Sequence, residues 1–356
     1  MSRDALRGAA RRTATSRVDG ARTRRVGAAL AITVLVGTTA ACGSDAGADT
    51  ADGEVEGKTV ALVACGDVNP WCAVYNKTIV EGLEAEGVTV EYLQDPFDVA
   101  LQIQNLNSAI ASRPDLILNF PTDDQSVVPS LQQAKSQGVP VIIAGSTPAP
   151  EAEDLVASTI NADQAALGTY AAQNIVEGLQ ARGLDEGKVI AIAGSDTTAT
   201  SGERMEAFEE ELAKTPEYEL VEVRNGNWDP ALTGRIASQL FAQYESQGGI
   251  QAAYGMADYQ ANAIIQSAQQ AGLPLGVEDD GLIVTGSNCF KVGVDNIRSG
   301  AQYGTATQTP TAEGEYVVEH TLAFLRGEEI DEVNLNSEDR VTADNLDEFA
   351  DVCSEA

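Results

Sequence analysis

Short apolar runs alternate with longer amphipathic segments along most of the chain. Each run is nearly continuous in apolar and β-branched residues, which is typical of a strand buried on both faces. The first half contains runs at residues 58–64, 89–93, 116–119 and 139–143. Between these runs apolar residues recur every three or four positions, as at Val99, Ile103, Leu106 and Ile110, and this spacing predicts helices.

The same alternation continues in the second half. Further strands are expected at residues 188–192, 219–223, 250–254 and 282–285, and helices near 201–213, 231–244 and 257–271. Two successive series of strand–helix–strand units predict an α/β fold with two similar, doubly wound parallel sheets, each covered by helices on both faces.

The first 41 residues have a different character. Residues 1–25 contain eight arginines and two aspartates, and Val26–Ala41 carries no charge. This basic stretch followed by an apolar stretch predicts an export signal, too short to span a membrane comfortably. The residues up to Cys42 resemble a bacterial lipobox, although Thr39 stands where leucine is usual. Cys42 is therefore the expected lipidation site, with ordinary secretion or a retained anchor as alternatives.

Composition narrows the possible functions. The chain has 54 acidic and 22 basic residues and a net charge of −32, which excludes a protein that follows nucleic acid backbones. His320 is the only histidine, so multi-histidine metal sites are excluded, and no cofactor or metal is expected. Residues 42–57 are mostly small or acidic and predict a flexible tether, and the folded part is expected to begin near Lys58.

Ligands of doubly wound sheets bind beyond the carboxyl ends of the strands. The segments that follow the predicted strands here are rich in amides, hydroxyl groups and indoles and poor in cations, so they do not resemble a phosphate cradle. They are 65–72, 119–123, 145–147, 194–198, 227–229, 256–258 and 286–288.

The order of these segments is similar to that of the type I periplasmic sugar-binding proteins of the ribose-binding group. The similarity includes Asn69-Pro70-Trp71, the run Asp115–Asp123, the run Gly138–Ile143 and, later, Gln308-Thr309-Pro310, and it extends over about residues 58–345. The resemblance implies two lobes joined by three crossings, near 158–161, 308–310 and 336–340. The first lobe would comprise residues 58–160 and 309–336, and the second 161–308 and 337–356.

The resemblance also implies a function. Proteins of this group close on a small solute and deliver it to an ABC importer, so we expect an extracytoplasmic lipoprotein, anchored to the cell membrane, monomeric and working with permease subunits. A sensor that presents its solute to a membrane receptor would have the same sequence signature. An enzyme on this fold is disfavoured, because the chain contains no G-x-S-x-G elbow and its one histidine lies far from the strand ends.

Site residues follow from the resemblance one position at a time. Aromatic faces cover the C–H side of a sugar ring, and amides and acids pair with its hydroxyl groups. The expected ligand-binding residues are Asn69, Trp71, Asn119, Asp123, Ser146, Trp228, Asp258, Asn288 and Gln308.

Several positions depart from the pattern of the group. Gly145-Ser146 replaces an Asp-Arg pair, Ser201-Gly202 replaces an arginine that the group usually has there, and Ala257 replaces an asparagine, while Arg204 is expected to point elsewhere. These losses argue against an ordinary pyranose. A neutral hydroxylated solute is expected: a small polyol, a cyclitol, or a deoxy or furanose sugar. A flat heterocycle between Trp71 and Trp228 is the other possibility.

Four cysteines remain besides Cys42, and three pairings of them are possible. The resemblance implies that Cys65 pairs with Cys72, because these positions lie close together in the group. It also places Cys289 and Cys353 in the second lobe and implies that they form the other disulfide. Such pairings leave the hinge between the lobes free. His320 lies among apolar residues of a late helix and is expected to be structural.

Overall fold

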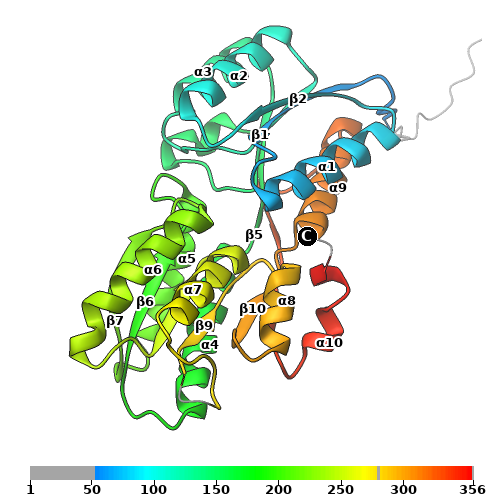
Figure 1. The fold of residues 1–356 in the computed structure, drawn as a ribbon. Coiled ribbons are helices and arrows are strands. Elements are labelled where there is room, and N and C mark those ends of the chain that lie inside the picture. Colours follow the sequence, from blue (N-terminus) through cyan, green and yellow to red (C-terminus); the bar gives the residue numbers. More distant parts are fainter. Residues whose placement is uncertain (1–52, 279–280, 355–356) are drawn as a thin grey trace, which may run out of the picture. The chain divides into compact units, whose positions relative to one another are not determined.

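The computed structural model describes residues 53–278 and 281–354 (Figure 1). The predicted export signal, Cys42 and the tether up to residue 52 lie outside the described residues. The end of the predicted tether is wrong: Val55 is 7% exposed and packs in a hydrophobic core, and its carbonyl accepts a hydrogen bond from the Lys58 N–H at 3.0 Å.

The first lobe contains a six-stranded sheet in which all strands are parallel, in the order β11-β5-β4-β3-β1-β2. Its helices are α1 (Pro70–Ala85), α2 (Val99–Ser112), α3 (Val128–Gln137) and α9 (Pro310–Arg326), with the 3-10 helix Pro150–Leu155. The strands are β1 (Thr59–Cys65), β2 (Thr89–Asp95), β3 (Leu116–Asn119), β4 (Val141–Ala144), β5 (Ser158–Ala162) and β11 (Val333–Asn336).

The second lobe repeats this plan with the order β12-β10-β9-β8-β6-β7, in which only β12 is antiparallel to its neighbour. The strands are β6 (Gly187–Ala193), β7 (Tyr218–Asn225), β8 (Ala252–Gly255), β9 (Ile283–Thr285), β10 (Gly304–Ala306) and β12 (Arg340–Thr342). The helices are α4 (Gln164–Ala181), α5 (Ala199–Leu212), α6 (Pro230–Tyr244), α7 (Asp258–Gln270), α8 (Lys291–Arg298) and α10 (Leu346–Phe349), with 3-10 helices at Glu245–Gln247 and Val352–Ser354. The predicted fold of two doubly wound α/β lobes is confirmed.

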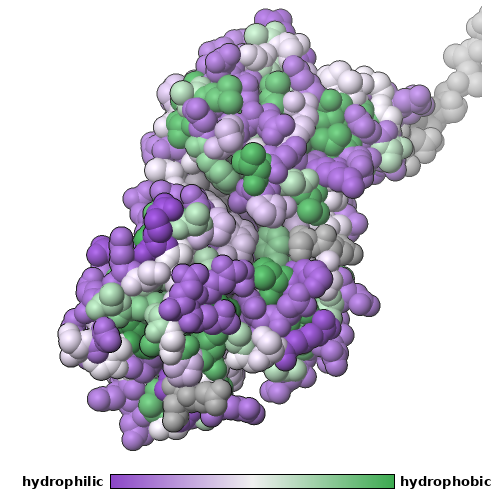
Figure 2. All heavy atoms as spheres, viewed as in Figure 1, coloured by the Kyte–Doolittle hydropathy of each residue, from purple (hydrophilic) through white to green (hydrophobic). Residues whose placement is uncertain are grey.

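Each sheet is buried on both faces, which explains the nearly continuous apolar strands. In the first lobe, Leu62 and Leu118 point toward α1 and α9, which lie side by side, and Val63 and Ile117 point toward α2 and α3 (Figure 1). The second sheet is sandwiched in the same way between two apolar clusters. Hydrophilic side chains cover much of the visible outer surface (Figure 2), as the charge of the chain requires.

Caps fix where several helices begin. The Asn69 side chain accepts hydrogen bonds from the N–H groups of Trp71 and Cys72, and Pro70 occupies the first turn, where a missing N–H costs nothing. Asp229 before Pro230 and Thr309 before Pro310 use the same device. Because Asn69 and Thr309 stand next to residues of the cleft described below, these caps also position the site.

The chain passes between the two lobes three times. The passages follow β5, β10 and β11, since the next element in each case belongs to the other sheet or packs with it. Residues 158–161, expected to form the first passage, lie within β5, so that passage begins a few residues later than predicted.

Two disulfides are present, between Cys65 and Cys72 and between Cys289 and Cys353, with Cα–Cα distances of 5.9 and 4.8 Å. Each joins residues of one lobe, as the resemblance implied. In the part of the chain that the structure describes, no helix has the length and apolar character needed to cross a bilayer.

The Cys289–Cys353 disulfide ties the end of the chain to α8, and its loop is much longer than that of the other disulfide, with sequence separations of 64 and 7. Longer loops restrict the unfolded chain more. We therefore predict that replacing Cys289 and Cys353 together by serine lowers the free energy of unfolding by about 2–4 kcal/mol in urea titrations.

The matched control replaces Cys65 and Cys72 by serine, which should cost less stability because that loop is short. A larger loss in this control than in the Cys289/Cys353 variant would contradict the prediction.

Candidate functional site

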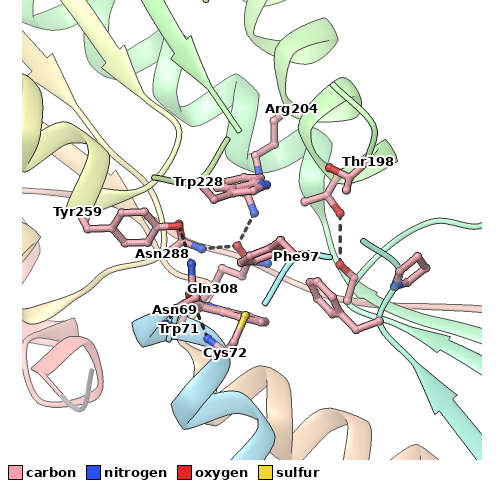
Figure 3. A pocket seen from close by; sticks show the side chains of 14 residues that line it. Asn69, Trp71, Cys72, Phe97, Thr198, Arg204, Trp228, Tyr259, Asn288 and Gln308 are labelled. Atoms are coloured by element: carbon pink, nitrogen blue, oxygen red, sulfur yellow. Dashed lines mark hydrogen bonds between the residues drawn. The ribbon is translucent and has the colours of Figure 1, made fainter. Parts of the chain in front are cut away.

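A cavity lies between the two lobes, at the carboxyl ends of both sheets (Figure 3). Aromatic rings, amides and hydroxyl groups from both lobes form its wall, together with one charged side chain. The lining residues are Asn69, Trp71, Cys72, Phe97, Phe120, Pro121, Gly145, Thr198, Thr200, Arg204, Trp228, Tyr259, Asn288 and Gln308.

The loop after β1 supplies one wall. The Cys65–Cys72 disulfide closes this loop, and the cap formed by Asn69 holds it against the start of α1. The Trp71 ring stacks on Tyr75 with centroids 4.6 Å apart, and its Nε1–H donates to the carbonyl of Gln308 at 3.1 Å. The indole is therefore held on one side by α1 and at its polar edge by the second crossing.

Glycines give two aromatic rings their places. Gly145 follows β4 with a φ of +81°, and a Cβ there would lie 2.1 Å from the Phe120 ring. Gly194 follows β6, and a Cβ there would lie 2.1 Å from the Trp228 ring. Neither position accepts a side chain, so Gly145, which departs from the sugar-binding pattern, makes room for an additional aromatic wall.

Arg204 lines the cavity, and the expectation that it points elsewhere is wrong. It lies in the second turn of α5, and helical side chains lean toward the helix N-terminus, here toward the cleft. Its guanidinium lies 5.7 Å from the centre of the Trp228 ring.

Neutral oxygens satisfy this guanidinium. It donates to the side chain of Gln164 at 2.6 Å, to the carbonyl of Met256 at 3.1 Å and to Oε1 of Gln308 at 2.5 Å. Arg204 is 1% exposed, and burial lowers its pKa from the ordinary value. The ion pairs of the described residues do not include it.

Gln308 joins the two walls. Its Oε1 also accepts from Nδ2 of Asn288 at 2.6 Å, as the dashed lines of Figure 3 show. Both residues have left-handed backbones, with φ of +80° and +82°. Within the described residues Oδ1 of Asn288 is buried and has no hydrogen-bond partner. The cavity therefore contains a free acceptor, suited to a hydroxyl or other donor.

Five of the nine predicted contact residues line the cavity: Asn69, Trp71, Trp228, Asn288 and Gln308. Asn119 is fully buried in β3, where neither polar atom of its side chain has a partner among the described residues. Asp123 accepts from the N–H of Ser126 at 2.7 Å, and Ser146 donates to Asp124 at 3.0 Å. These three side chains do not line the cavity.

Asp258 is the fourth predicted residue outside the lining. Its carboxylate accepts from the N–H of Phe290, the side chain of Gln302 and the hydroxyl of Thr305, at 2.7–3.0 Å. It is fully buried, and burial raises its pKa to about 7 despite these bonds. Asp258 thus fixes the loop that carries Asn288, and its carboxylate is held by the protein rather than presented to the cavity.

Several lining residues were missed as specific contacts, among them Phe97, Phe120, Thr198, Thr200 and Tyr259. All of them lie within a few residues of the end of β2, β3, β6 or β8. Position alone could have found them, because the cavity forms at these strand ends. The hydroxyl of Tyr259 accepts from Nδ2 of Asn69 at 3.4 Å, a contact between the two lobes.

Two buried carboxyl groups lie at the crossings behind the cavity. Burial raises the pKa of Glu313 to about 7 and that of Glu338 to about 8, and their mutual repulsion adds to the effect on Glu338. Glu338 accepts from the hydroxyl of Thr307 at 2.6 Å. The Gln308 side chain faces Glu313, yet neither Glu313 oxygen has a well-formed hydrogen bond within the described residues.

The residues present do not suit a metal ion. Within residues 53–278 and 281–354, no group of three or more His, Cys, Asp or Glu side chains is arranged to hold one.

Comparison with known proteins gives consistent results. Residues 60–329 match the family model described as "Periplasmic binding protein domain". The chain is 23% identical over 250 residues to the xylitol-binding protein of Mycolicibacterium smegmatis, covering 70% of this chain and 67% of that protein. It is 22% identical over 230 residues to the galactofuranose-binding protein YtfQ of Escherichia coli, covering 64% and 70%. A crystal structure of a galactofuranose-binding protein superposes with a TM-score of 0.75 at 18% identity, covering 83% and 97%.

Glu313 yields a prediction about stability and pH. Because folding raises its pKa from 4.5 to about 7, the folded state is favoured while the carboxyl is neutral and loses stability as the pH rises through about 7. Glu313→Gln stays neutral. Its free energy of unfolding should therefore exceed that of the wild type at pH 8.5, by about 1–3 kcal/mol, and differ much less at pH 6.

Chemical denaturation at the two pH values measures this difference. Glu315→Gln, at an exposed site on the same helix, is the control and should leave the pH dependence unchanged. If Glu313→Gln declined with pH as steeply as the wild type, the burial argument would fail.

Proposed function

We propose, from the premise that the chain belongs to the periplasmic binding protein family, that it is the extracytoplasmic solute-binding lipoprotein of an ABC importer. The family consists of binding proteins, so the chain is a solute-binding protein and not an enzyme. The finer proposal is that it closes on one small, neutral, hydroxylated solute, that Cys42 carries the lipid anchor, and that permease subunits receive the solute.

One observation carries the choice of solute: aromatic faces and amides line the cavity without a carboxylate. Trp71 and Trp228, from different lobes, offer surfaces for the C–H faces of a ring or chain. The N–H groups of Arg204 are engaged by neutral oxygens, and Asn288 offers a free acceptor for a hydroxyl group. An uncharged solute whose polar groups are hydroxyls fits this inventory.

The relatives support a narrower class. One is named for xylitol, a polyol, and another for galactofuranose, a five-membered ring. Both classes were expected from the departures at Gly145 and Ala257, which remove groups that grip a pyranose. We therefore propose a polyol or furanose as the solute, with cyclitols and flat heterocycles as the comparison classes.

The lobe boundaries belong to the same proposal. Residues 58–160 with 309–336 would move as one body and 161–308 with 337–356 as the other. The solute would stabilise the closed arrangement by contacting Asn69 and Trp71 on one side and Trp228 and Asn288 on the other.

A thermal-shift screen of the purified protein tests the proposed class. The panel contains xylitol, arabinitol, galactose and arabinose, which populate furanose forms, glucose, myo-inositol and adenosine. A solute that binds only the folded state adds about 2.7 kcal/mol of stability at 100 times its dissociation constant. Stabilisation by a polyol or furanose-forming sugar alone supports the proposal, whereas stabilisation only by adenosine would assign the cavity to a heterocycle.

Trp228→Ala tests the position of the site. Loss of the indole face should weaken binding of the solute found in the screen by about 10- to 100-fold, measured by calorimetry. Trp228→Phe keeps an aromatic face and should recover much of the affinity. Unchanged affinity in the alanine variant, with an unchanged melting temperature, would place the site elsewhere.

A further inference from the structure

A second set of contacts joins the two lobes beside the cavity. The loops after β3 and β4 of the first lobe meet the loop after β6 and the start of α5 in the second. We call this set the latch; it consists of Thr122, Asp124, Gly145 and Ser146 on one side and Thr197, Ala199 and Thr200 on the other.

Asp124 lies at the centre of the latch. One carboxylate oxygen accepts from the Ala199 N–H at 2.5 Å, and the other accepts from the hydroxyl of Ser146 at 3.0 Å. The Asp124 N–H donates to the carbonyl of Thr197 at 3.3 Å. Asp124 is 5% exposed and does not line the cavity, so its bonds are made to the protein alone.

The contact with Ala199 completes a helix of the other lobe. Ala199 is the first residue of α5, whose first N–H groups need acceptors from outside the helix. The N-cap residue, Thr198, makes no capping bond with its side chain. Asp124 therefore replaces the missing cap from across the cleft, where a carboxylate also interacts favourably with the helix dipole.

Hydroxyl groups extend the latch on both sides of this cap. The Thr197 hydroxyl donates to the carbonyl of Thr122 at 3.2 Å, and the Thr200 hydroxyl donates to the carbonyl of Gly145 at 3.2 Å. Thr200 also lines the cavity, and so does Gly145. The latch and the wall of the cavity thus share residues, and separation of the lobes at this edge would break both.

We propose that Asp124 is a positioning residue for solute binding: it caps α5 from the opposite lobe and thereby holds the lobes in the arrangement in which Trp71 and Trp228 line one cavity. The consequence for affinity rests on the proposed solute-binding function. The consequence for the separation of the lobes does not, because the latch contains protein groups only.

The charge of Asp124 modulates this role. Asp123 and Glu203 face it with like charge, and burial, which is the larger cause, raises its pKa from 3.8 to about 6. In a separated arrangement the carboxyl would be hydrated and its pKa ordinary. The latched state therefore binds the proton more tightly, and lowering the pH from 7.5 to 5.5 favours latching. The hydrogen bond from Ala199 persists, since a protonated carboxyl still has an acceptor oxygen.

Two substitutions separate the cap from the charge. Asp124→Ala removes both, whereas Asp124→Asn keeps an acceptor for the Ala199 N–H and removes the charge. Asp123→Asn is the matched control, because Asp123 is the neighbouring acid and caps Ser126 within its own lobe.

The separation of the lobes is measured on the whole protein by small-angle X-ray scattering at pH 5.5 and 7.5. Tryptophan fluorescence is the second readout, because the chain has two tryptophans and both line the cavity. We expect Asp124→Ala to have a larger radius of gyration than the wild type at both pH values. Asp124→Asn should match or exceed the compactness of the wild type at pH 7.5 and show no change between the two pH values.

Affinity follows the same order. With the solute that stabilises the wild type in the screen, Asp124→Ala should bind about tenfold more weakly, mainly through faster dissociation, and Asp124→Asn should bind at least as tightly as the wild type. A wild-type radius and wild-type fluorescence in Asp124→Ala would overturn the latch. So would an Asp124→Asn variant as open as Asp124→Ala, since a neutral cap would then have no effect.

The two proposals fail in different ways. If no solute in the panel stabilises the wild type while the scattering separates the variants as expected, the proposed solute class is wrong and the latch stands. If a polyol or furanose-forming sugar binds while all variants scatter alike, the solute class stands and the latch is wrong.

Discussion

The arrangement around the cavity depends on how the guanidinium of Arg204 is satisfied away from water. A buried cation without partners costs several kcal/mol, and no carboxylate among the described residues forms an ion pair with this one. Three neutral oxygens accept its hydrogen bonds, and one of them belongs to Gln308, which also holds Asn288 and Trp71. One residue of the second crossing therefore fixes the positions of both walls.

The fold could be predicted from periodicity where strands are long and buried. β1 and β6 have seven residues each, and their apolar runs are unmistakable. β10 and β12 have three residues each, and β12 pairs at the edge of its sheet, too short for a two-residue period to emerge. The helix α4 was also missed between its neighbours, because its buried face is built partly from glycine and alanine, which carry little hydrophobic signal.

The site was predictable in position and less so in role. Strand ends located the cavity, but residue type does not reveal whether a polar group faces solute or protein. Asp258 illustrates the limit: a carboxylate after a strand suggests a ligand contact, yet three donors of its own lobe occupy it. Arg204 shows the converse, because its partners come from segments distant in the sequence, Gln164, Met256 and Gln308, and only the folded chain brings them together.

The distribution of acids explains why closure and protonation are coupled in this molecule. Most of the 54 acidic residues serve the hydrated surface, but Asp124, Glu313 and Glu338 are buried beside the cleft or at its crossings, and burial raises the pKa of each. Hydrophobic groups would fill the same space without this cost. A carboxylate, however, can accept from a helix N-terminus of the other lobe, and an apolar side chain cannot. Any group that is buried by closure and hydrated by opening must bind its proton differently in the two states, so a contact of this kind links the position of the lobes to pH by necessity.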